Sequence, residues 1–158
     1  ESQNLLKLSG GMGLTRLLFN RVCDFTFKAR QDGNEWDLTM SAVLSRDGQY
    51  IWVMAWLDPL PKNPGDVPKM AMLRLLANND RLGKGQFFAY VSGNRRIVLQ
   101  RVVENRGITQ AKFREIVTDL SISVIQTYPY WSVENWKQTP ASAPQTPAST
   151  KKTNPKSK

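Results

Sequence analysis

Catalysis and metal binding depend on particular side chains, and this sequence has few of them. It contains no histidine and one cysteine, Cys23, which we expect to fill a small buried apolar position. Without histidine, the usual base that activates a serine or cysteine nucleophile is missing. A metal site would need oxygen ligands alone, and the sequence has no calcium-loop spacing. We therefore expect no enzyme activity, no cofactor and no metal site.

The carboxylates that could form a catalytic pair have structural interpretations. Asp32 and Asp47 each precede a glycine in a predicted turn, and Asp66 stands where its carboxylate could cap a helix. Glu115 and Asp119 lie one turn apart on the polar side of a predicted helix. None of these pairs indicates acid–base chemistry.

Aromatic side chains provide the strongest candidates for a binding function. Tyr50, Trp52 and Trp56 share one face of a predicted strand, and Phe88 and Tyr90 share one face of another. If helices cover the opposite side of the sheet, these side chains form an apolar patch. Such a patch would bind a peptide, a second subunit or the chain's own termini. In the alternative arrangement, the aromatics form the core and the other face of the strand points outward.

Three predicted strands precede the middle of the chain. Residues 25–30 and 36–44 have the two-residue period of half-buried strands. Residues 50–57 are apolar on both faces, as in a central strand that is covered on both sides. Asp-Gly pairs at 32–33 and 47–48 are typical of two-residue hairpin turns, so the three strands should form an antiparallel meander.

Helices and a second hairpin complete the predicted domain. A first helix is predicted over 14–22, and a second follows Asp66. Two strands, joined by a tight turn at Gly93-Asn94, then precede a last helix that Thr109 caps and Pro129 ends. The apolar side of the second helix is predicted to consist of Met70, Leu73, Leu76 and Ala77. This order of elements predicts an α+β fold.

The two ends of the chain differ in composition from the middle. Residues 1–13 are predicted to form a flexible arm, 14–136 the domain and 137–158 a disordered tail with four prolines and no large apolar residue. Five of the nine net positive charges come from tail lysines, so residues 1–136 carry +4, a value that solubility alone explains. No apolar run is long enough to span a membrane. The start at Glu1 favours an exported or periplasmic protein, from which a signal segment has been removed, over a cytoplasmic one.

The order of elements and the stretch LLANNDRLGKGQFFAYVSGNRRIVLQRVVENRGITQAKFREIV, residues 75–117, resemble the type III secretion chaperone-like superfamily, which includes the YbjN-type and Tir chaperone-like domains. The resemblance covers residues 23–128. It implies a noncatalytic and often dimeric protein that binds extended segments of other proteins on apolar patches of the sheet and first helix. Secretion chaperones proper are typically acidic and cytoplasmic, whereas this chain is basic and has a tail. The resemblance therefore favours a YbjN-like peptide-binding domain over a dedicated effector chaperone.

The sequence thus predicts a noncatalytic protein- or peptide-binding domain, and one alternative stays open. A basic domain with exposed aromatics could bind single-stranded nucleic acid by stacking and charge. The cations that favour this alternative are Arg95, Arg96, Arg101, Arg106, Lys112 and Arg114. The strand over 84–91 has the basic and aromatic character of an RNA-recognition strand, but three consecutive strands at the start do not match that fold.

Overall fold

The computed structural model describes residues 21–136. The predicted arm, the tail and nearly all of the predicted first helix lie outside the described residues. Arg21 and Val22 are the exceptions, and neither is helical: Arg21 has a left-handed φ angle of 59°, and Val22 begins a strand. None of the helices in 21–136 is long and apolar enough to cross a membrane.

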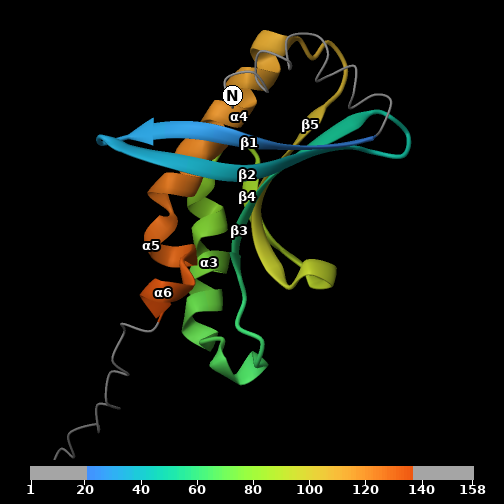
Figure 1. Cartoon of the computed structure of the whole chain (residues 1–158). Helices are drawn as coiled ribbons and strands as arrows, with labels where there is room; N and C mark the ends of the chain where they lie inside the picture. Colours follow the sequence, from blue (N-terminus) through green and yellow to red (C-terminus); the bar gives the residue numbers. More distant parts are fainter. Residues whose placement is uncertain (1–20, 137–158) are drawn as a thin grey trace, which may run out of the picture.

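Five strands form one antiparallel sheet in the order β1-β2-β3-β5-β4 (Figure 1). The strands are β1 (Val22–Gln31), β2 (Asn34–Leu44), β3 (Tyr50–Pro59), β4 (Gln86–Val91) and β5 (Arg96–Glu104). The first three form the predicted meander, and the hairpin of β4 and β5 joins it by pairing β5 with β3. Strand β3 is therefore the centre of the sheet.

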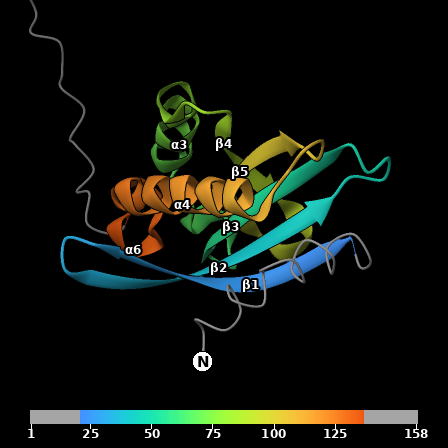
Figure 2. The same ribbon diagram turned by 90° about the horizontal axis from the view of Figure 1, so that it is seen from above.

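The helices lie on one side of this sheet. They are α3 (Lys69–Leu82), α4 (Gln110–Gln126), α5 (Tyr128–Trp131) and α6 (Val133–Trp136), with one-turn 3₁₀ helices η1 (Pro64–Asp66) and η2 (Ser92–Asn94). Figure 2 shows α4 crossing the sheet and α3 beside β4 at its edge. The structure has the α+β order expected from the sequence.

The core lies between α4 and the sheet. Phe113 of α4 contacts Phe25 of β1 with ring centroids 6.3 Å apart. The aliphatic side chains that α4 contributes are fully buried, and they are Ile116, Val117, Leu120 and Val124. Thr109 caps this helix as predicted, since its hydroxyl accepts a hydrogen bond from the Lys112 N–H. Helix α4 ends at Gln126, and Pro129 lies in the first turn of α5 instead of stopping a longer helix.

Of the three predicted turns, only the first has the predicted geometry. Asp32 and Gly33 both have positive φ angles, 52° and 79°, as a two-residue hairpin turn needs. The connection between β2 and β3 is longer than predicted, spans residues 45–49 and has a positive φ only at Gly48. In the last hairpin, η2 occupies the turn and Arg95 adopts the left-handed conformation in place of the predicted Gly-Asn pair.

Helix α3 corrects two predictions. Asp66 belongs to η1, and Pro68 stands at the N-cap of α3 without a side-chain hydrogen bond, so Asp66 does not cap it. The side of α3 predicted to be buried is exposed to solvent, and it consists of Met70, Leu73, Leu76 and Ala77. The buried side consists of Ala71, Leu75 and Asn78. Burial of Asn78 is tolerated because its side-chain amide donates to the Arg74 carbonyl oxygen, 2.8 Å away.

Candidate functional site

Strand β3 divides its side chains between two very different environments. Ile51, Val53, Ala55 and Leu57 point toward α4 and are buried. We call this side of the sheet the inner face. Because successive side chains in a strand alternate, those between them point the other way. They are Tyr50, Trp52, Met54 and Trp56, and they define the outer face.

The outer face is therefore the aromatic side of β3, and the helices cover the opposite side. The sequence did not show which face of β3 the helices cover. The prediction that β3 is covered on both sides is wrong, because Tyr50 and Trp52 are exposed on the outer face. Trp52 and Tyr50 keep 38% and 42% of their surface exposed in the described structure. Aromatic rings with this exposure could contact another molecule.

Apolar side chains extend across the outer face on both sides of Trp52. The strand register pairs Trp52 with Val43 of β2 and Val102 of β5, and Val43 with Val22 of β1. These four side chains form a row at right angles to the strands, which we call the Trp52 row. Such a row presents apolar surface to a ligand from four neighbouring strands.

A second row lies around Trp56, about 13 Å from the first, because four residues of a strand separate the two tryptophans. Trp56 pairs with Val98 of β5, and Val98 pairs with Ala89 of β4. Val98 is fully buried although it points away from α4. We call these three residues the Trp56 row.

Hydrogen bonds and a cation hold the Trp56 ring in place. Its Nε1–H donates to Ser41 Oγ at 2.7 Å, and the Ser41 hydroxyl donates to an Asp24 carboxylate oxygen. The Arg96 guanidinium lies over the ring, 5.8 Å from its centroid. Arg96 is itself fixed, because its Nε–H donates to the Leu57 carbonyl oxygen at 2.8 Å. The ring is thus oriented before any ligand arrives.

The structure does not bring Phe88 and Tyr90 together with the tryptophans. They pair with Leu99 and Ile97 of β5, which point to the inner face, so both lie on that face. Phe88 is buried in the core, with 6% of its surface exposed. Tyr90 is 57% exposed, on the side of the sheet that carries α3. Only Tyr50, Trp52 and Trp56 of the five predicted binding residues share a surface.

Four of the six cations that favoured nucleic acid make internal contacts. Arg95 donates to the carbonyl oxygens of Pro61 and Lys62, and Arg96 donates to Leu57. Arg101 and Lys112 make the ion pairs described below. These contacts use donors that phosphate groups would need, so the described structure adds no support for a nucleic-acid surface.

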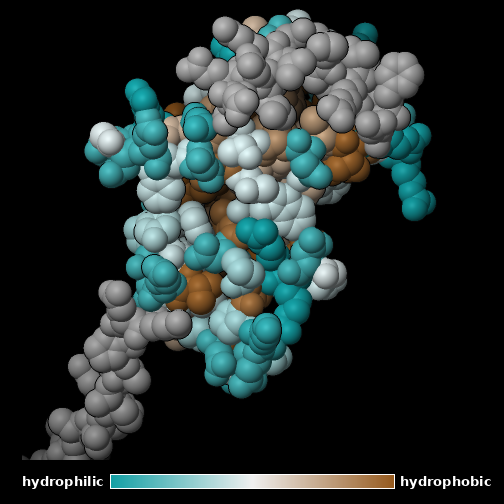
Figure 3. All heavy atoms as spheres, viewed as in Figure 1, coloured by the Kyte–Doolittle hydropathy of each residue, from teal (hydrophilic) through white to brown (hydrophobic). Residues whose placement is uncertain are grey.

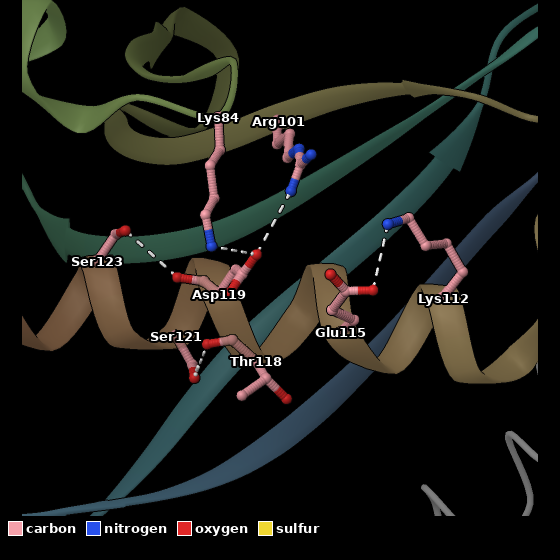
Figure 4. Close-up of polar contacts among 8 residues, drawn as sticks. All are labelled: Lys84, Arg101, Lys112, Glu115, Thr118, Asp119, Ser121 and Ser123. Atoms are coloured by element: carbon pink, nitrogen blue, oxygen red, sulfur yellow. Dashed lines mark hydrogen bonds and ion pairs between the residues drawn. The ribbon is translucent and has the colours of Figure 1, made fainter.

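Both carboxylates of helix α4 take part in ion pairs (Figure 4). Asp119 lies 2.8 Å from Lys84 Nζ and 3.8 Å from Arg101 Nη1. Glu115 lies 3.2 Å from Lys112 Nζ. As predicted, the two carboxylates lie on the polar side of the helix, and the Asp119 pairs connect α4 to β5 and to the loop before β4.

Asp47 and Cys23, which were also considered for catalysis or metal binding, lie in a turn and against the core. Hydrogen bonds from the Ser45 hydroxyl and then the Gln49 backbone N–H lower the pKa of Asp47, which is the arrangement of a turn. Cys23 is a free thiol on the inner side of β1, partly buried against the core. Within residues 21–136 there is no group of three or more cysteine, aspartate or glutamate side chains that could hold a metal ion.

Comparison with known proteins gives matches at the level of structure alone. No protein-family model and no curated protein matches the sequence. A chain of the ExsC–ExsE complex superposes with a TM-score of 0.51 at 9% identity, covering 82% of this chain and 96% of that one.

Two further solved structures are similar at a lower level. A chain of the ExoU–SpcU heterodimer from the type III secretion system of Pseudomonas aeruginosa gives a TM-score of 0.46 at 14% identity, covering 67% of this chain and 82% of that one. A chain of the HopA1–SchA chaperone–effector complex gives 0.44 at 13% identity, with coverage of 78% and 94%. The superposition with the chain of the ExsC–ExsE complex shows a secretion chaperone-like α+β fold, which is the fold that the resemblance predicted.

Proposed function

We propose that this chain is a noncatalytic binding domain that holds an extended or amphipathic segment of a partner protein on the outer face of its sheet. One observation carries the proposal: Tyr50 and Trp52 are exposed on the face that the helices leave open, within a row of valines. Exposed apolar patches of this kind are typical of interaction sites. The similarity to a chain of the ExsC–ExsE complex supports the proposal, because that chain is part of a complex.

The spacing of the two rows specifies the ligand further. Trp52 and Trp56 are four residues apart in β3, so an extended segment that lies along the strands would place its residues i and i+4 over them. Residue i+2 would lie over Met54, beside Ser41 and Gln100. We therefore expect ligands with large apolar side chains at i and i+4 and a polar or small side chain between them.

The test is a selection from a library of unstructured peptides displayed on phage. Peptides are selected on the wild-type protein and counter-selected on Trp52→Ala, and the affinity of the enriched peptides is measured by calorimetry. Truncating an aromatic anchor of a peptide site costs on the order of 2 kcal/mol, which weakens binding by about 30-fold. Tyr90→Ala is the matched control, because it removes an exposed aromatic from the other side of the sheet.

The result separates this proposal from nucleic-acid binding. Affinity for an apolar peptide should change little between low and moderate salt, whereas affinity for a single-stranded oligonucleotide falls steeply because phosphates release counterions. Enriched peptides that bind Trp52→Ala as tightly as wild type would contradict the outer-face site. Tight, salt-sensitive oligonucleotide binding that is unaffected by Trp52→Ala would favour the alternative.

We propose a second surface, on α3, for self-association. Met70, Leu73 and Leu76 are 56–61% exposed and lie three residues apart, so they form one apolar strip along the helix. Figure 3 shows brown apolar surface among hydrophilic surface over the region where α3 lies. A homodimer would cover this strip.

Sedimentation velocity over a range of concentrations tests the dimer. Leu73→Asp/Leu76→Asp should sediment as a monomer at concentrations where the wild type sediments as a dimer. Arg74→Asp/Ala77→Asp also adds two acidic side chains to exposed positions of α3, but it leaves the three large apolar side chains in place. A wild-type monomer at every concentration would contradict the dimer and leave the peptide site as a separate question.

A further inference from the structure

The Trp52 row lies at the point where residues 1–20 join the sheet. Val22, the first residue of β1, is part of this row and has 47% of its surface exposed. The preceding segment therefore enters the fold beside the most apolar row of the outer face.

Arg21 changes the direction of the chain at this point. Its carbonyl oxygen accepts a hydrogen bond from the Leu44 N–H, 2.8 Å away, so its position beside β2 is fixed. Its φ angle is 59°, in the left-handed region, where the chain leaves the straight course of a strand. This bend at Arg21 leaves a course back over the sheet open to the preceding segment.

The segment before Arg21 has the chemistry that the outer face requires. Residues 14–19 read LTRLLF, so four of these six side chains are large and apolar. In an extended segment, Leu14 and Leu18 lie on one side and about 13 Å apart, as Trp52 and Trp56 do along β3. Twenty residues can extend over about 65 Å, far more than the roughly 13 Å between the two rows. The tail has no large apolar residue and could not cover the patch in this way.

We propose that residues 14–19 bind back onto the outer face and cover the Trp52 and Trp56 rows until a partner displaces them. Leu18, which is closer to Val22 in the chain, covers the Trp52 row, and Leu14 covers the Trp56 row. This inference rests on the proposed function, because it regulates the same site. An intramolecular occupant lowers the apparent affinity for a partner in proportion to the fraction of molecules in which the site is closed. It also keeps an aromatic surface out of water in the absence of a partner.

The experiment is ¹⁹F NMR of the full chain labelled with 5-fluorotryptophan. The chain has five tryptophans, and the lines of Trp52 and Trp56 are assigned by their loss in Trp52→Phe and Trp56→Phe. Leu14→Asp/Leu18→Asp should shift both lines toward the position of solvent-exposed fluorotryptophan and leave the line of Trp131 in place, because Trp131 is buried among the helices. The matched control is Gln3→Asp/Asn4→Asp, which adds the same charge to the polar start of the segment and should move neither line.

The outcomes separate the inference from the proposed function. Unmoved Trp52 and Trp56 lines overturn the inference, as does a shift that includes Trp131 or depends on protein concentration, which would indicate unfolding or a second copy on the patch. If the lines stay in place while Trp52→Ala still weakens peptide binding, the inference fails and the peptide site stands. If the lines move as expected, Leu14→Asp/Leu18→Asp should also bind the selected peptides several-fold more tightly than wild type.

Discussion

The two faces of β3 differ in their exposure to water and in the hydrogen bonds that their side chains make. On the inner face, Ile51, Val53 and Leu57 carry no polar atoms and are closed off from water by α4. On the outer face, Trp56 needs a hydrogen bond from its indole N–H to Ser41, and Trp52 keeps over a third of its surface in contact with water. In β3, the face that the helices bury carries aliphatic side chains, whereas the open face carries aromatic side chains whose polar atoms can be satisfied by a neighbour or by water. One strand can therefore supply both the core and a binding surface.

The largest expected effect is on the free energy of unfolding, and it distinguishes the inner face of β3 from the outer face. Leu120→Ala removes a fully buried side chain that packs against the inner face, and it should lower the free energy of unfolding by about 2–5 kcal/mol. Trp52→Ala should cost less than half as much, because its ring is only partly removed from water. Urea unfolding followed by circular dichroism measures both. Equal costs would mean that the outer face is as much a part of the core as the inner face.

A smaller effect is expected where the outer face is held rigid. Arg96→Met keeps much of the aliphatic stem but removes the cation over Trp56 and the hydrogen bonds to the Leu57 carbonyl, which should cost about 1 kcal/mol. Arg106→Met is the control, since it removes the same charge from an exposed loop position. The near-ultraviolet circular dichroism of the tryptophans should weaken in the first variant alone. An equal loss of signal in both would show that charge, and not the contact with the ring, orders Trp56.

The sequence was sufficient to predict the order of the described strands and helices, but not which face of each element is buried. Alternation of apolar and polar residues located β1 and β2, because each buries one face, and Thr109 identified the start of α4. In β3 both faces are apolar, so periodicity could not show which one the helices cover.

In helix α3 the periodicity did indicate which side is buried, and it indicated the wrong side. The helix has a strip of large apolar residues and, on another side, Ala71, Leu75 and Asn78. The periodicity predicted burial of the side that carries Met70, Leu73 and Leu76, whereas the fold buries the other side. The Asn79 side-chain oxygen accepts a hydrogen bond from the Phe88 N–H, at 2.7 Å, and this contact holds the helix at the edge of β4. That contact joins residues nine apart in two elements, which no local pattern predicts.

The smallest expected effect concerns the connection between β2 and β3, which fixes the register and thus which residues of β3 point outward. Hydrogen bonds from Ser45 and Gln49 lower the pKa of Asp47 in the folded state from its ordinary value of 3.8. A depressed folded-state pKa gives stability that is present above the unfolded-state pKa and is lost as the pH falls through the folded-state value. Asp47→Asn should therefore be slightly less stable than wild type at pH 7, and the difference should shrink below pH 3.8.

Urea unfolding at a series of pH values measures this difference, and Ser45→Ala provides the control. In a Ser45→Ala background the largest cause of the shift is gone, so Asp47→Asn should change the free energy of unfolding less than it does in the wild type. Peptide binding at pH 7 completes the comparison. The register of β3 is also fixed by its pairing with β5, so Asp47→Asn should leave the affinity of the outer face for the selected peptides unchanged. A loss of affinity would mean that the connection between β2 and β3 alone determines the face on which Trp52 lies.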